Sequence, residues 1–325
     1  MPPYIELENM PSAAVIPALS PRPQLEQGLT ARNVHSWTVF LGELVAAGRI
    51  RIGTSLPAVT LEHHGNWPGI HIEDSFGIAS GCRFTLRMAL DRWSEIDRSK
   101  MDAVGRDRHS DVSILGRDGA PVLDLGFGED HNGIASDVPA RYAARCRTPS
   151  WSEPAPKRNG DAEALDHDPA RGWAASPGNA ADVVDPDEAM GQLLLSPERL
   201  RERGCFSTVD AALVPCFLEA LAEQALPIRI DTGTAGVAHS LDCTFFCHRR
   251  EGAWQTLKSD SARFRIDTSK IDSAWVLTVS QAAREHSSLR LYDTRGRLLA
   301  KIGAVPGFVA IENPIWRTLV NALQD

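Results

Sequence analysis

Three blocks of this chain occur twice, in the same order along the sequence. In the first pair, an amphipathic helix runs into an Ile-Arg-Ile strand. In the second pair, an Arg-Phe strand leads to a tryptophan, and in the third, two strands flank a turn that contains glycine. The paired blocks are residues 40–55 with 217–233, 83–93 with 263–275, and 112–125 with 289–302.

The separation between the paired blocks is almost constant. It is far longer than the repeat unit of a solenoid, so it predicts a duplicated domain rather than an array. We therefore expect residues 31–147 and 185–325 to form two similar units. The separation agrees closely whether it is counted from Phe40 to Phe217, from Arg83 to Arg263 or from Gly119 to Gly296.

The hydrophobic pattern inside the units predicts an α+β fold. Residues 83–90 alternate, so Phe84, Leu86 and Met88 share one face of a strand and Arg87 lies on the other, with Arg83 and Thr85. Asp118 and Gly119 form an Asp-Gly hairpin signal. Strand runs joined by short turns, with helices at the ends of each copy, indicate antiparallel sheets. Each unit should therefore hold a large antiparallel sheet with flanking helices, predicted at residues 37–47, 209–224 and 315–323, and Trp93 and Trp275 should lie in equivalent strands.

Two stretches fall outside the repeated blocks. Residues 1–30 contain many prolines and little periodicity, which indicates an irregular lead-in. Residues 148–184 are rich in Pro, Gly, Asp and Ala, which is typical of a linker or a long surface loop. The organisation we expect is a lead-in, a first unit at 31–147, a linker at 148–184 and a second unit at 185–325.

Composition excludes several classes of protein. The net charge of −8 argues against a general nucleic-acid binder, since neutralising phosphates requires a basic face. The first residues lack the pattern of a signal peptide, and no apolar run is long enough to insert into a membrane. The six cysteines are scattered, which favours reduced, buried thiols over a disulfide framework. These features together predict a cytoplasmic protein.

The short motifs with chemical meaning are weak. Residues 243–248 read Cys-Thr-Phe-Phe-Cys-His, one residue too long for the Cys-x-x-Cys-His haem attachment pattern. On a single strand, Cys243 and Cys247 would share one face as two buried thiols. His63 and His64 are neighbours, so on a strand they face opposite ways and do not bind one metal together. No phosphate-binding loop, dinucleotide motif or nucleophile elbow occurs.

A further pattern is carried by segments spread over both copies. In the first copy a Leu-Arg strand leads to Trp93, and in the second a Gly-rich turn precedes a strand that reaches His239. The segments are residues 58–65, 84–93, 227–239, 271–276 and 289–296. Their order, their duplication and the length of the chain resemble the HemS/ChuS family of bacterial haemin-degrading and haem-trafficking factors.

This resemblance implies a tandem pair of α+β units that binds haem in a cleft. In that family an axial histidine comes from the helix that opens the second copy, and an arginine of the Leu-Arg strand lies on the other face of the haem. Arg87 matches this arginine. A guanidinium at that place suits hydrogen bonding to a bound water or to a propionate.

The sequence also departs from the family pattern. Asp187 stands where the axial histidine is expected, and a carboxylate is a poor substitute for imidazole on haem iron. A surrogate such as His239 or His167 would then have to hold the iron. Three polar motifs of the family are replaced by residues 234–235, 278–280 and 302–305.

Two functions follow from this comparison. The first is a cytoplasmic haem-utilisation protein that binds haem for intracellular transfer, or for oxygenase-like degradation with release of iron. A haem-uptake transporter or a haem oxygenase would be its partner. The second is a non-enzymatic, degenerate member of the fold, which lost the axial histidine and acts as a binding or partner module. The sequence leaves open whether degradation occurs.

We expect Asp187→His to strengthen haem binding and to shift the Soret band towards imidazole ligation. Haem binding by the natural protein should be weak, because this chain also lacks Arg and Lys positions with which the family holds the propionates. Each of these partners is worth about 1.5–3 kcal/mol as a charged hydrogen bond. Losing two of them weakens binding by roughly two to four decades. Haemin titrations of both proteins, followed by absorbance, measure the change. If the natural protein binds haem tightly and the substitution alters neither spectrum nor affinity, the alignment at Asp187 is wrong. The ligand is then among His35, His63, His64, His71, His167 and His239.

Overall fold

A computed structural model describes residues 24–45, 48–97, 110–127, 206–234, 236–281, 284–305 and 312–324. The predicted linker at 148–184 and the residues Asp187 and His167 lie outside these ranges. In the first half the elements are α1 (Gln24–Leu44), β1 (Arg49–Leu56), β2 (Val59–Asn66), β3 (Ile70–Glu73), β4 (Phe76–Ser80), β5 (Phe84–Ala89), β6 (Trp93–Asp97), β7 (Ser110–Gly116) and β8 (Pro121–Phe127).

The second half repeats this series of elements. It contains β9 (Phe206–Val209), α6 (Val214–Glu223), β10 (Pro227–Gly233), β11 (Val237–Thr244), β12 (Cys247–Glu251), β13 (Trp254–Lys258), β14 (Ala262–Asp267), β15 (Ser273–Gln281), β16 (Arg284–Tyr292), β17 (Leu298–Ala304) and α7 (Pro314–Asn321). Strands β10 to β17 therefore correspond in order to β1 to β8. Even the short 3-10 turns agree, since η2 (Leu90–Arg92) follows β5 and η5 (Thr268–Lys270) follows β14.

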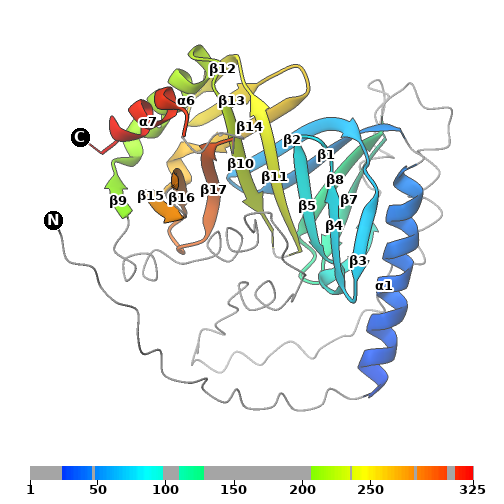
Figure 1. The fold of residues 1–325 in the computed structure, drawn as a ribbon. Helices are drawn as coiled ribbons and strands as arrows, with labels where there is room; N and C mark the ends of the chain where they lie inside the picture. Colours follow the sequence, from blue (N-terminus) through cyan, green and yellow to red (C-terminus); the bar gives the residue numbers. More distant parts are fainter. Residues whose placement is uncertain are drawn as a thin grey trace, which may run out of the picture.

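The strands form two large antiparallel sheets (Figure 1). The eight-stranded sheet has the order β12-β13-β14-β2-β1-β8-β7-β6, and the nine-stranded sheet the order β3-β4-β5-β11-β10-β17-β16-β15-β9. This confirms the α+β prediction with large antiparallel sheets. Each sheet, however, joins five strands of one half to three strands of the other, and β9 is added at one edge of the larger sheet. The junctions are the β14–β2 and β11–β5 ladders.

The register repeats between the halves as well. The pair Ile78 and Arg87 has its counterpart in the pair Thr256 and Arg265. Phe84, which begins β5, corresponds in the same way to Ala262, which begins β14. The pairing of Arg83 with Arg263 in the sequence comparison is therefore slightly out of register, and the true counterpart of Arg87 is Arg265.

Trp93 and Trp275 lie in the corresponding strands β6 and β15, as predicted, but not at corresponding positions. Ile96 pairs with Ile114 as Ala274 pairs with Leu291, which places Trp275 opposite Asp97 in the comparison of the halves. Trp93 packs edge-on against Trp37 in the main core, with ring centroids 5.1 Å apart. Trp275 belongs to a separate cluster with Leu277 and Tyr292.

The helices bury one apolar stripe each. In α1 the buried residues include Trp37, Phe40, Leu41 and Leu44, and in α6 they include Phe217, Leu218 and Leu221. α1 lies beside β3 on one side of the molecule, and α6 lies with α7 on the other (Figure 1). The Phe217 and Trp316 rings meet edge-on at 5.7 Å, which packs α7 against α6. One continuous core runs through both halves.

Several predicted boundaries are wrong. α1 begins at Gln24, inside the stretch expected to be an irregular lead-in. The predicted helix at 209–224 is shorter, because β9 ends at Val209 and a 3-10 turn precedes α6. The single strand expected at 243–248 is split, because Phe245 turns into the core and Phe246 is exposed. Cys243 therefore lies near the end of β11 in a buried position, whereas Cys247 begins β12 and is exposed.

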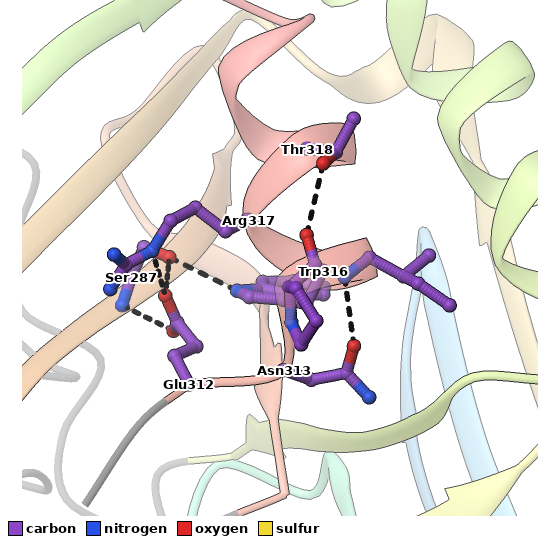
Figure 2. A network of polar contacts seen from close by, with 8 residues as sticks. Ser287, Glu312, Asn313, Trp316, Arg317 and Thr318 are labelled. Carbon is purple, nitrogen blue, oxygen red and sulfur yellow. Dashed lines mark hydrogen bonds and ion pairs between the residues drawn. The ribbon is translucent and has the colours of Figure 1, made fainter.

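A buried polar network holds the C-terminal helix to β16 (Figure 2). The carboxylate of Glu312 accepts hydrogen bonds from the Ser287 backbone N–H at 2.7 Å and from Ser287 Oγ at 2.8 Å. Trp316 Nε1 donates to Ser287 Oγ at 3.0 Å. Asn313 caps α7 by accepting from the Ile315 backbone N–H at 2.9 Å. Glu312 and Trp316 thus fix both the start and the buried side of α7.

We expect Glu312→Gln to lower the free energy of unfolding by about 1–3 kcal/mol, because the charged acceptor becomes neutral and an amide N–H takes the place of the oxygen that accepts from Ser287 Oγ. Urea denaturation measures the loss. The matched control is Glu251→Gln, since Glu251 forms an exposed ion pair with Arg249 and should change stability little. Equal effects of the two substitutions would show that the network does not anchor α7.

Candidate functional site

Arg87 lies on the outer face of the nine-stranded sheet, which is the face turned away from the other sheet. Leu86 and Met88 are fully buried in the core, so the alternation of β5 directs Arg87 the opposite way. Thr85 shares its face, as the sequence predicted. The cross-strand neighbours of Arg87 are Ile78 on β4 and Ala238 on β11.

A row of three side chains crosses β3, β4 and β5 on this face. His71 pairs with Ile78, and Ile78 pairs with Arg87. Ile78 is 40% exposed and His71 is exposed, whereas Arg87 is only 8% exposed. The placing of His71 and Arg87 in one row across β4 was not predicted from the sequence. The alternation of buried Gly77 and Ala79 with Phe76 and Ile78 was the available signal.

The outer face has an open part and a closed part. Over β15 to β17, the side chains of Trp275, Leu277, Tyr292 and Arg290 are buried. The open part covers β3, β4, β5 and β11, and Arg87 lies among its residues although its own side chain is buried. The exposed or half-buried residues around Arg87 are His71, Ile78, Ser80, Thr85, Ala238 and Ser240.

Two cations near the open part are held in ion pairs. Arg229 donates to both carboxylate oxygens of Asp242, at 2.6 and 2.8 Å. This hydrogen bonding raises the pKa of Arg229. Lys301 Nζ lies 3.3 Å from Asp231 Oδ2. Asp242 and Asp231 already neutralise these cations, so Arg229 and Lys301 attract an anionic ligand less strongly than they would without these carboxylates.

His239 lies on the other face of the same sheet, between the two sheets. It pairs with Leu86, while its neighbour Ala238 pairs with Arg87. The ring is fully buried and joins a hydrogen-bond chain. Its Nδ1 lies 3.2 Å from Thr54 Oγ1, and its Nε2 lies 3.1 Å from His63 Nδ1. The sequence predicted that Arg87 and His239 would contact the same haem. In the structure their side chains lie on opposite faces of the sheet.

Both buried histidines are held neutral. Burial lowers the pKa of His63 to about 4, and the charge of neighbouring His64 adds to this. Burial also lowers the pKa of His239 well below its usual value, with a further contribution from His63. Each neutral ring has one N–H donor and one acceptor nitrogen, so the hydrogen bonds that join Thr54, His239 and His63 can all run in one direction. A second proton would set one ring N–H against another.

Within the described ranges, no group of three or more His, Cys, Asp or Glu side chains could hold a metal ion. None of the helices in the described part has the length and apolar character that crossing a bilayer requires. Burial raises the pKa of the Cys243 thiol, which donates to Ser259 Oγ at 3.2 Å. This thiol is therefore a packed core group.

Comparisons with known proteins agree with this architecture. The model of the haemin-degrading HemS.ChuX domain matches residues 199–323. Residues 199–323 are therefore similar to the HemS/ChuX domain family. This confirms the family resemblance inferred from the sequence.

Solved structures extend the likeness over most of the chain. Holo-PhuS, a heme-binding protein from Pseudomonas aeruginosa, is 18% identical, with a TM-score of 0.69 over 88% of this chain and 84% of PhuS. ChuS, an E. coli heme oxygenase, is 15% identical, with a TM-score of 0.68 over 92% of each chain. No curated protein matches the chain. The fold shared with PhuS and ChuS therefore also includes the first half of this chain, which lies outside the HemS/ChuX match.

We expect the stability of the protein to fall between pH 7 and pH 5 because of the buried histidine pair. The native pKa of His63 lies near 4 and the unfolded value near 6.5, so the unfolded state takes up the proton first as the pH falls. For His63 this difference removes about 2 kcal/mol over this range, and the lowered pKa of His239 acts in the same direction. Stability above pH 7 should be flat with respect to these groups.

The corresponding positions in the other half supply the test. Leu61 stands in the matching ladder at the place of His239, and Leu241 stands at the place of His63. Denaturation curves at pH 7 and pH 5 should show a smaller loss for the double variant His63→Leu/His239→Leu than for the natural protein. The exposed His35→Leu serves as control. A double variant that loses as much stability as the natural protein would place the pH dependence elsewhere.

Proposed function

We propose that this protein binds haem on the open part of the outer face, with Arg87 beside the bound group. The single observation that carries the proposal is the position of Arg87. The residue that matches the family's arginine lies next to an open sheet surface, in a chain whose residues 199–323 match the HemS.ChuX domain model. PhuS, which has the same fold, is a heme-binding protein.

The residues of the open part fit the chemistry of haem. The ring is flat and apolar, and Phe76 and Ile78 lie on the same face of β4 to meet it. The propionates are carboxylates, and the guanidinium of Arg87 suits their geometry. Bound haem supplies an iron centre that binds axial ligands and small molecules. The protein contributes the apolar surface, the cation and the orientation of the ring.

We propose further that the protein acts in the cytoplasm in haem utilisation. Haem held against an open sheet face is accessible for handover, which favours transfer to a partner such as a haem oxygenase, or receipt from an uptake transporter. ChuS is a heme oxygenase, so degradation with iron release is the alternative activity. Incubating the haem complex with a reductant in air separates the two. Transfer predicts a persistent Soret band, and degradation predicts its loss with release of iron.

The decisive experiment is a haemin titration of the natural protein and of Arg87→Met. Losing one charged hydrogen bond of about 1.5–3 kcal/mol should weaken binding by roughly one to two decades. Absorbance in the Soret region gives the affinity, and a thermal melt verifies that the variant is folded.

Arg265→Met is the matched control. Arg265 holds the same register position in the other sheet and lies over the Trp254 ring at 5.0 Å. This substitution should leave haem affinity unchanged. A natural protein that does not bind haemin would refute the proposed function and favour the degenerate binding module. Equal losses for Arg87→Met and Arg265→Met would refute the proposed place of the haem.

A further inference from the structure

We infer that His71 is the axial ligand of haem iron in this protein. This inference rests on the proposed function, since it concerns the same open face. It replaces His239, one of the two surrogate ligands expected from the sequence, which is sealed between the sheets; the other, His167, lies outside the described residues. It assigns the iron to a strand residue of the first half rather than to the segment around Asp187.

The structure separates the described histidines by the surface they occupy. His63 and His239 are buried between the sheets. His64 follows His63 on β2 and points to the far face of the eight-stranded sheet, and His248 shares a hydrogen bond with Gln255 in that sheet. His35 is an exposed residue of α1. Among the described residues, the outer face of the nine-stranded sheet carries His71 and His286.

Distance decides between these two histidines. His71 and Arg87 stand in one row, two strands apart, so their Cα atoms are about 10 Å apart. His286 lies on β16, and β11, β10 and β17 separate that strand from β5. Four strand spacings amount to about 19 Å. One haem can therefore reach His71 and Arg87 together, but not His286 and Arg87.

The chemistry of the row matches the parts of haem in order. The imidazole of His71 is a suitable donor to haem iron. Ile78 lies between His71 and Arg87 and is 40% exposed, which offers an aliphatic surface to the ring. Arg87 stands at the far end, on the same side of the haem as His71 and unlike the family's arginine, and a propionate would accept its hydrogen bonds there. His71 is exposed, so no buried contact has to break before it binds iron.

The other half of the chain provides an internal comparison. The positions that correspond in register to His71, Ile78 and Arg87 are Arg249, Thr256 and Arg265. The fold therefore accepts an arginine and a threonine at the first two places. The sheet itself therefore requires neither an imidazole nor an exposed isoleucine at these places. Of these two rows, only the one in the first half combines an imidazole, an aliphatic side chain and a guanidinium.

The test is a haemin titration of the full chain and of His71→Ala, read by the position of the Soret band and by affinity. The natural protein should show imidazole ligation. His71→Ala should lose that signature and bind haemin at least about tenfold more weakly. Removing a residue that only hydrogen-bonds to a metal ligand already lowers metal affinity by about this factor. Added imidazole should restore the spectrum of the variant, which a merely structural role of His71 would not allow.

The controls separate the possible failures. His286→Ala removes an exposed histidine from the same face and should titrate like the natural protein. Unchanged circular dichroism and thermal melting of His71→Ala verify its fold. If the natural protein binds haemin and His71→Ala keeps the imidazole spectrum and affinity, the assignment of His71 is refuted while haem binding stands. If the natural protein binds no haemin, the proposed function itself is refuted.

Discussion

The structure depends on two backbone ladders that join the halves of the chain. β14 pairs with β2 in one sheet, and β11 pairs with β5 in the other. Without these ladders each half would leave long strand edges unpaired, with their N–H and C=O groups exposed. The five-plus-three exchange of strands also makes the core continuous, so helices α1 and α6 cover parts of one shared interior.

The same ladders create the candidate haem face. β5 belongs to the first half but is built into a sheet that is mostly formed by the second, and Arg87 is thereby placed beside β11. The family match covers only residues 199–323, yet the open part of the face lies largely on β3, β4 and β5. The site is therefore a joint product of both halves, although each contributes different chemistry.

Local patterns allowed part of this to be predicted from sequence. The alternation of β5 was enough to place Arg87 opposite Leu86 and Met88, and Asp118 with Gly119 marked the hairpin between β7 and β8. Nothing in that alternation says which strand will be the hydrogen-bond partner, so the exchange of strands stayed hidden. For the same reason His239 looked available for iron, because its burial comes from the opposite sheet rather than from its own strand.

The pairing of β2 with β14 has a consequence for synthesis of the chain. His63 in the first half lies opposite Ala262 in the second, so the eight-stranded sheet joins segments made far apart in time. Contacts of such long range are slow to form, because a large loop must close first. During translation the backbone N–H and C=O groups on this edge of β2 stay unpaired until β14 has left the ribosome. That interval is when this protein would most need a chaperone.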